Sequence, residues 1–199
     1  MPASLAGTQR LLALGDSFTI GTGSSVDEAF PARLAERWRA AGCTTELRNV
    51  AVNGYTSRDV IDRELPEVAR FSPTWITLAV GANDLVRRVP EETYRDNVRL
   101  ILATATKVTP KDHVLVLPQP DWARSEVGQS FGITQEDVDR FDAVLREEAS
   151  AVGARFVDLE SLMRAQAEAH MVASDGLHPN AAAHAEWAEA IGAVATGCR

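Results

Sequence analysis

Residues 74–84 of this chain read Thr-Trp-Ile-Thr-Leu-Ala-Val-Gly-Ala-Asn-Asp. The apolar run at positions 75–80 has the length of a β-strand and is far too short to span a membrane. A glycine and polar residues follow the run, which is typical of a strand that leads into a turn. Positions 114–117, Val-Leu-Val-Leu, have the same character. Both runs are therefore predicted to be β-strands.

Along the rest of the sequence, short strand-like segments alternate with longer segments of helical periodicity. This alternation is the pattern of a parallel sheet covered by helices. Strands are expected at residues 10–15, 46–52, 74–80, 114–117 and 155–159. Helices are expected at residues 30–41, 57–69, 90–108, 134–152, 161–170 and 179–194, with one long irregular loop at residues 118–132. The sequence thus predicts an α/β fold, with residues 1–199 forming a single domain.

Length and composition agree with one domain. The chain has 199 residues, a net charge of -8 and 45% hydrophobic residues, within the range of ordinary globular domains. A fold of this size buries roughly 70% of the surface of its unfolded chain, so its stability requires no metal or cofactor, and none is expected. Acidic charge and scattered arginines predict no nucleic-acid partner. The sequence leaves the oligomeric state open.

The two cysteines, Cys43 and Cys198, have no second cysteine at a metal-ligand spacing and are interpreted as incidental thiols. A Cys43–Cys198 disulfide stays open, because the sequence does not say whether the C-terminus returns to the first helix. The first 17 residues lack the basic start and long apolar core of a secretory signal. A cytoplasmic location is therefore expected, and export would require a start upstream of this sequence.

In an open parallel sheet, ligands bind outside the carboxyl ends of the strands. Four blocks stand out near predicted strand ends and before the last helix: residues 15–19 (Gly-Asp-Ser-Phe-Thr), 53–55 (Asn-Gly-Tyr), 81–84 (Gly-Ala-Asn-Asp) and 175–179 (Asp-Gly-Leu-His-Pro). Each block alone has an ordinary explanation as a turn or a helix cap. Their combination indicates catalytic chemistry.

Acyl transfer by serine needs a nucleophile, a base, a carboxylate that orients the base, and donors for the developing oxyanion. Ser17 is the candidate nucleophile and His178 the candidate base. Asp175 lies on the same short turn, where it can accept a hydrogen bond from one imidazole nitrogen while the other faces Ser17. Pro179 disfavours a helical conformation at His178, which places the imidazole at a loop–helix junction.

The candidate oxyanion donors are the backbone amides of Ser17 and Gly54 and the side-chain amide of Asn83. Gly54 suits this role because the absent Cβ lets a substrate approach the amide. Three further residues are candidates for lining an acyl pocket, with core packing as the equal alternative: Tyr55, Leu85 and Trp122. Arg87 and Arg88 either meet an anionic leaving group or belong to a solvated face.

These four blocks resemble the signature blocks of the SGNH (GDSL-type) hydrolase superfamily in residue type, in order and in their span from residue 15 to residue 179. The resemblance implies a flavodoxin-like three-layer α/β/α sandwich with a five-stranded parallel sheet. It also implies a triad of Ser17, Asp175 and His178 and an oxyanion hole of Ser17, Gly54 and Asn83. The chain has Phe18 where the commonest pattern has leucine, and it lacks the Gly-x-Ser-x-Gly turn of the α/β-hydrolases.

Members of the superfamily include esterases, lysophospholipases, acyl-thioesterases, arylesterases and carbohydrate deacetylases, so the resemblance implies a reaction and leaves the substrate open. We expect a serine hydrolase that cleaves a carboxylic ester or thioester through an acyl-enzyme. A small-molecule or soluble ester is the expected substrate, since only about twenty residues follow His178 and none form a lid domain.

Two alternatives remain. The first is a non-catalytic module of the same fold that binds a carbohydrate or another small ligand. The second is a metal-dependent hydrolase, because carboxylates and an imidazole at strand ends also suit a divalent ion. Its ligands would be Asp16, Asp84, Asp175 and His178. The intact set of serine, histidine and aspartate favours the serine hydrolase, for which no metal is expected.

Overall fold

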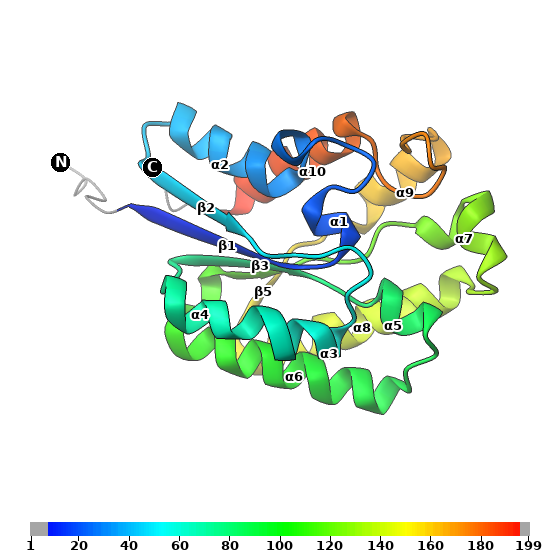
Figure 1. The fold of residues 1–199 in the computed structure, drawn as a ribbon, viewed down its shortest axis with the longest axis horizontal. Helices are drawn as coiled ribbons and strands as arrows, with labels where there is room; N and C mark the ends of the chain where they lie inside the picture. The colour runs from blue at the N-terminus through cyan, green and yellow to red at the C-terminus, as the bar shows by residue number, and fades with distance from the viewer. Residues whose placement is uncertain (1–7, 196–199) are drawn as a thin grey trace.

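The computed structural model describes residues 8–195, which contain a five-stranded sheet (Figure 1). All neighbouring strands pair in parallel, in the order β2-β1-β3-β4-β5. The strands are β1 (Gln9–Gly15), β2 (Thr45–Asn49), β3 (Trp75–Ala79), β4 (Val114–Val116) and β5 (Arg155–Phe156). The predicted five-stranded parallel sheet is therefore confirmed. Cys198 lies outside the described residues, and with it the question of a Cys43–Cys198 pair.

Helices cover both faces of the sheet, which confirms the predicted α/β/α layering (Figure 1). One layer contains α1 (Ser17–Ile20), α2 (Phe30–Ala40), α9 (Glu160–Glu168) and α10 (Ala181–Val194). The other contains α3 (Ser57–Asp59), α4 (Leu65–Phe71), α5 (Ala82–Val86), α6 (Glu91–Val108) and α8 (Gln135–Val152). The short helix α7 (Glu126–Ser130) lies in the connection that follows β4.

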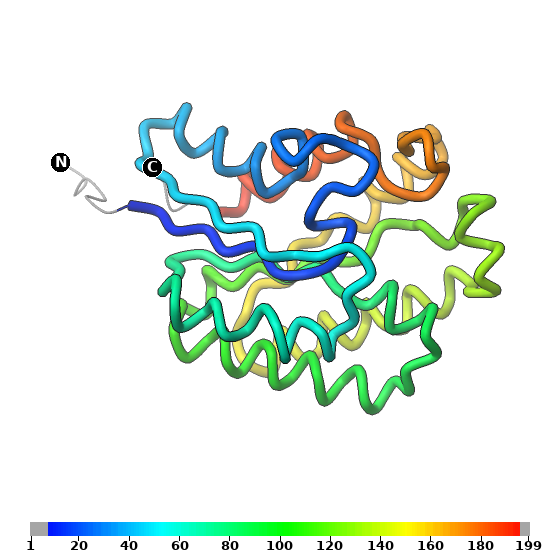
Figure 2. Tube along the Cα trace, in the orientation of Figure 1, coloured from blue at the N-terminus to red at the C-terminus, as the bar shows by residue number. Residues whose placement is uncertain are grey.

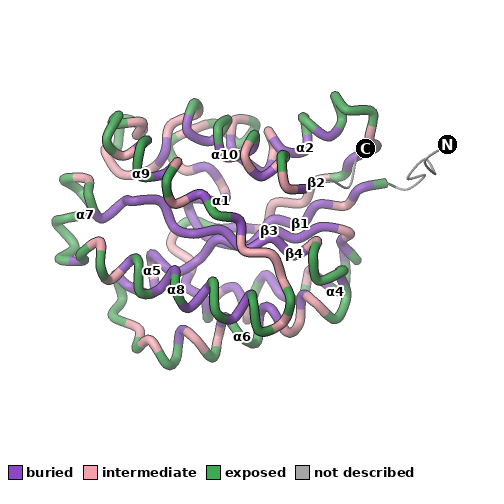
Figure 3. The backbone as a smooth tube through the Cα atoms, turned by 180° about the vertical axis from the view of Figure 1, so that it is seen from behind, coloured by how far each residue is buried: buried purple, intermediate pink, exposed green. Residues whose placement is uncertain are grey.

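The core follows the two-residue period of the strands. Successive side chains of a strand point to opposite faces, so each strand supplies both layers. Leu12 and Leu78 pack with α4, α6 and α8, whereas Leu11 and Trp75 pack with α2 and α10. Figure 3 shows the result, with buried strands enclosed by helices whose outer faces are exposed. Both faces of the sheet are therefore buried, and its carboxyl edge carries the loops described below.

The expected boundaries differ from the structure at several places. β5 ends at Phe156, three residues before the expected end, and β2 ends at Asn49. The segment 118–132, expected to be irregular, contains a 3₁₀ turn (Trp122–Arg124) and α7, which the Ser125 side chain caps. The last helix begins at Ala181 because the Asn180 side chain accepts a hydrogen bond from the Ala183 N–H.

The expected helix at 57–69 is divided into three parts. Between α3 and α4 lies a π-helix, Val60–Glu64, in which the Leu65 N–H donates to the Val60 carbonyl five residues before it. Pro66 follows directly and has no N–H to donate, which removes one ordinary helical hydrogen bond at this point. π-Turns of this kind are frequent at functional sites. Here the turn places Glu64, only 1% exposed, under the end of β1.

Candidate active site

Ser17 is the first residue of α1 and is separated from the end of β1 by Asp16 alone. The Asp16 side chain caps this helix by accepting a hydrogen bond of 3.0 Å from the Phe18 N–H. Gly15 precedes the turn with a φ of 147°, and a Cβ there would collide with the carbonyl oxygen of Ala79 on β3. The sharp turn therefore needs this glycine. It places Ser17 at the carboxyl edge of the sheet, as predicted.

Asp175 and His178 form the predicted pair. His178 Nδ1 lies 2.7 Å from Asp175 Oδ2, and Asp175 Oδ1 accepts the backbone N–H groups of Leu177 and His178. Burial raises the pKa of Asp175, but the hydrogen bonds from His178 and Leu177 outweigh it and hold that pKa below its ordinary value. Asp175 is therefore ionised at neutral pH and fixes the orientation of the imidazole.

The His178 turn packs against the turn that follows β1, although the two are about 160 residues apart in sequence. The ring centroids of His178 and Phe18 are 5.4 Å apart. A Cβ on Gly23 would lie 3.3 Å from the His178 Cβ. Figure 2 shows the blue segment after β1 near the orange segment before α10. No hydrogen bond joins the Ser17 hydroxyl to His178 within residues 8–195, and such bonds often tighten only when substrate binds.

Asn83, on α5 after β3, connects the first three blocks. Its Nδ2 donates to the carbonyl of Tyr55, at 3.0 Å, and to Asp16 Oδ2, at 3.3 Å. Gly54 has a φ of 83°, and the space where its Cβ would stand holds nothing closer than Arg87 Nη2 at 4.0 Å. The carboxyl ends of β1, β2 and β3 therefore bring Ser17, Gly54 and Asn83 into one region.

Three buried carboxyl groups lie beneath this region. Burial raises the pKa of Asp84 to about 6, although Ser57 donates to it through both its N–H and its hydroxyl. Burial and the charge of Asp84 raise the pKa of Asp16 to about 7. Burial and the charge of Asp16 raise the pKa of Glu64 to about 8, while its Oε2 accepts the Gly15 N–H at 2.8 Å. Glu64 therefore keeps its proton near neutral pH, and Asp16 keeps part of its own, beneath the turn that holds Ser17.

The four ligands of the metal alternative lie in two separate places. Asp16 and Asp84 follow β1 and β3, whereas Asp175 and His178 lie on the turn before α10. Asp84 is engaged by Ser57, and Asp175 by the His178 turn. Within residues 8–195, no group of three or more histidine, cysteine, aspartate or glutamate side chains is arranged to hold a metal ion.

A cavity of about 310 Å³ lies beside the His178 turn, where Gly176, Leu177 and Pro179 line it, but Ser17, Gly54, Asn83 and His178 do not. Its apolar lining includes Trp122, Met163, Leu177 and Trp187. Of the three candidate pocket residues, only Trp122 lines this cavity. Leu85 is buried in the core beside α8, and Tyr55 lies in the loop after β2, under the Arg63 guanidinium. The sequence could not show that Met163 and Trp187 line a cavity, because the periodicity of their helices marks both equally well as core residues.

We expect Glu64→Gln to change how stability depends on pH. In the unfolded chain Glu64 loses its proton near the ordinary value of 4.5, whereas the folded chain keeps it to about 8. The folded state therefore loses stability relative to the unfolded state as the pH rises through this window, on the order of 5 kcal/mol. Glutamine does not titrate, so the variant should gain stability over the wild type between pH 5 and pH 9 in urea denaturation.

The matched control is Glu67→Gln. Hydrogen bonds from Arg70 and Arg48 lower the pKa of Glu67, so this carboxylate is ionised in both states above pH 5. The stability difference between Glu67→Gln and the wild type should therefore not grow with pH. Parallel stability curves for the wild type and Glu64→Gln would contradict the assignment of a retained proton to Glu64.

The structure is thus an all-parallel α/β/α sandwich with a Gly-Asp-Ser turn after its first strand and an Asp-His turn packed beside it. The chain belongs to the GDSL-like Lipase/Acylhydrolase family, whose model matches residues 13–186. It is therefore an enzyme of the hydrolase class. Within residues 8–195, no helix combines the length and the apolar character needed to cross a bilayer.

The chain is similar to thioesterase 1/protease 1/lysophospholipase L1 of Escherichia coli K12, with 30% identity over 97 residues. The match covers 49% of this chain and 45% of that protein, so it spans less than half of the relative. The crystal structure of TesA superposes with a TM-score of 0.75 at 24% identity, covering 94% of this chain and 97% of that one.

Two further solved structures share the fold. A lipase/acylhydrolase from Enterococcus faecalis has a TM-score of 0.78 at 21% identity, covering 93% of this chain and 94% of that one. The acetylxylan esterase Axe2 from Geobacillus stearothermophilus has a TM-score of 0.78 at 19% identity, covering 94% of both chains. The fold extends over nearly the whole of each chain.

Proposed function

We propose that this chain is a serine hydrolase that cleaves a carboxylic ester or thioester through an acyl-enzyme. Ser17 is the nucleophile, His178 the general base and Asp175 the carboxylate that orients the base. The observation that supports this most is the 2.7 Å contact between His178 and Asp175, on a turn packed against the residue that follows Ser17. With Nδ1 engaged, Nε2 is the nitrogen left for the serine proton.

In the first half of the reaction, Ser17 Oγ attacks the carbonyl carbon and its proton passes to His178. The tetrahedral intermediate collapses as His178 donates that proton to the leaving oxygen or sulfur, leaving an acylated Ser17. In the second half, water attacks the acyl group and gives a proton to His178, which then returns a proton to Ser17. Asp175, whose pKa is lowered, stays ionised and stabilises the imidazolium.

The oxyanion of each tetrahedral intermediate would be held by the backbone N–H groups of Ser17 and Gly54 and by the side-chain amide of Asn83. A neutral amide suits this role because its protonation does not change during the cycle. In the structure the two Nδ2 hydrogens of Asn83 go to the Tyr55 carbonyl, at 3.0 Å, and to Asp16 Oδ2, at 3.3 Å, so an oxyanion would have to replace the longer bond, the one to Asp16.

The acyl group would enter the cavity beside the His178 turn. Its walls include Trp122, Met163 and Trp187, an apolar lining that suits a hydrocarbon chain. The E. coli relative is named as a thioesterase and lysophospholipase, and Axe2 as an acetylxylan esterase. We propose a small or soluble ester or thioester as the substrate of this chain. A cytoplasmic location stays a prediction from the sequence.

Filling the cavity should shorten the acyl chain that the enzyme prefers. Ala167 lines the cavity from α9, whereas Ala165 on the same helix is exposed. We expect Ala167→Phe to lower kcat/KM for p-nitrophenyl octanoate about 10-fold, with p-nitrophenyl acetate within twofold of wild type, because a phenyl ring takes the space of the distal chain. Ala165→Phe is the control and should keep the wild-type profile. An unchanged chain-length profile in Ala167→Phe would place the acyl group elsewhere.

A further inference from the structure

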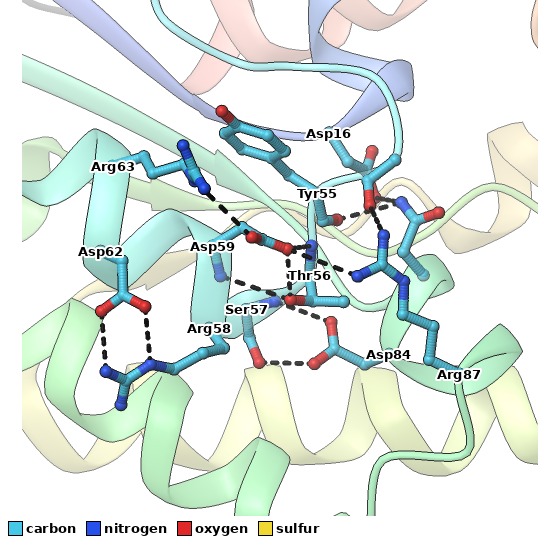
Figure 4. Close-up of polar contacts among 12 residues, drawn as sticks. Asp16, Tyr55, Thr56, Ser57, Arg58, Asp59, Asp62, Arg63, Asp84 and Arg87 are labelled. Atoms are coloured by element: carbon cyan, nitrogen blue, oxygen red, sulfur yellow. Dashed lines mark hydrogen bonds and ion pairs between the residues drawn. The ribbon is translucent and has the colours of Figure 1, made fainter.

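The peptide group that follows Gly54 is held at both of its polar atoms. Arg87 Nη2 donates to the Gly54 carbonyl oxygen at 2.7 Å, and the Tyr55 N–H donates to the Val52 carbonyl at 3.1 Å. Figure 4 shows Arg87 extended from α5 across this loop. Gly54 has a positive φ and an open space beside its Cα, so its own packing does little to fix its orientation. The hydrogen bond from the Arg87 guanidinium therefore restrains the orientation of the Gly54 carbonyl, which the packing of Gly54 itself does not.

Arg87 and Asn83 hold the same loop from one helical turn. The Arg87 N–H donates to the Asn83 carbonyl at 3.0 Å at the end of α5. The side chains of these two residues bind successive carbonyls of the loop, Arg87 that of Gly54 and Asn83 that of Tyr55. The Gly54 and Tyr55 carbonyls are thereby held relative to Asn83 by residues of a single short helical turn.

Asp59 orients the Arg87 guanidinium. Its Oδ2 lies 3.8 Å from Arg87 Nη1 and accepts both the N–H and the hydroxyl of Thr56, at 3.0 and 2.7 Å. The hydrogen bond from the Thr56 backbone lowers the pKa of Asp59, so it is an anion at neutral pH. Arg87 is 57% exposed, and an exposed contact of this kind adds little to the stability of the fold.

We propose that Arg87 is a positioning residue of the oxyanion hole: by holding the Gly54 carbonyl it limits how the Gly54 Cα can turn, and with it the Gly54 N–H on the preceding peptide group. The inference rests on the proposed function. A misaligned donor weakens binding of the transition state more than that of the ester, so its loss appears in kcat. Direct binding of an anionic leaving group, the other use of an arginine here, would instead raise KM for anionic substrates only.

The test uses p-nitrophenyl butyrate, which is uncharged, and three variants of the full chain. Arg87→Ala should lower kcat about 10-fold with KM within twofold, and Arg87→Lys, which keeps a donor able to reach the carbonyl, should recover most of that loss. Labelling by a fluorophosphonate should slow in parallel, because its transition state places negative charge in the same hole. Arg58→Ala, an exposed arginine paired with Asp62, is the control and should match wild type. Thermal unfolding of Arg87→Ala should shift by only a few degrees.

A wild-type kcat in Arg87→Ala would overturn the inference, as would a loss confined to KM or an Arg87→Lys variant as slow as Arg87→Ala. The Ser17→Ala variant separates this result from the proposed function. If Ser17→Ala is inactive while Arg87→Ala is unchanged, only the positioning role is wrong. If Ser17→Ala hydrolyses the ester as wild type does, the proposed function itself is wrong.

Discussion

Replacing Ser17 with alanine is expected to abolish acyl-enzyme formation and to lower kcat for p-nitrophenyl butyrate on the order of 10⁶-fold. The reason is chemical, because the hydroxyl is the group that forms the covalent bond and no other atom of the site replaces it. Intact-mass spectrometry after incubation with a fluorophosphonate should show one added probe per wild-type chain and none on the variant.

Ser25→Ala is a matched control for this experiment. Ser25 lies in the same connection after β1, but it is exposed and caps the 3₁₀ turn Val26–Glu28. The control should be labelled and should turn over ester at the wild-type rate. Stoichiometric labelling of Ser17→Ala would reject Ser17 as the nucleophile. A wild-type chain that binds an acetylated sugar but neither hydrolyses it nor accepts the probe would favour the non-catalytic binding module.

Asn83→Ala should lower kcat by about 10²–10³-fold with little change in KM, because the missing donor stabilises charge that exists only in the transition state. The same amide also holds the Tyr55 carbonyl and Asp16, so part of the loss could arise from a displaced loop. Steady-state kinetics on an uncharged ester, together with thermal unfolding, separates the two contributions.

Asn97→Ala provides the comparison. The Asn97 amide donates to the Ser57 hydroxyl in the network around Asp84, beneath the site and away from the proposed oxyanion. Its removal should cost stability, while kcat stays within about threefold of wild type. If Asn83→Ala changes only KM, Asn83 positions the substrate and the oxyanion hole must be assigned to other donors.

The sequence predicted the fold because the strands of a parallel sheet are continuous apolar runs, and those at 75–80 and 114–117 are easy to recognise. It predicted the candidate site because strand ends of a parallel sheet share one edge. It did not predict α1 and α5, which are four and five residues long and show no helical period. The strand expected at residues 155–159 is longer than β5, because the apolar residues Val157 and Leu159 pack into the core after the strand has ended.

Glu64 was overlooked, although the sequence contained a signal for it. It stands four residues after Val60 and four before Val68, both buried, and therefore on the apolar face of the expected helix. A carboxyl group at such a position is unusual enough to be noticed. Periodicity could not predict the hydrogen-bond partner of Glu64, because its contact with the Gly15 N–H depends on how the helix packs beneath β1.

The π-helix Val60–Glu64 has a consequence for chain length. A π-turn holds one residue more than an α-turn, so deleting one residue between Val60 and Asp62 would convert the segment to a regular helix. The extra residue is accommodated inside the π-turn, so the helix keeps nearly the same phase on both sides of it, whereas removing a residue from the regular helix α4 would turn everything beyond by about 100°. A deletion within Val60–Glu64 would therefore leave the direction of α4 unchanged and remove only the local widening that places Glu64 under the Gly15 amide. The fit between this carboxyl group and the end of β1 thus depends on one inserted residue.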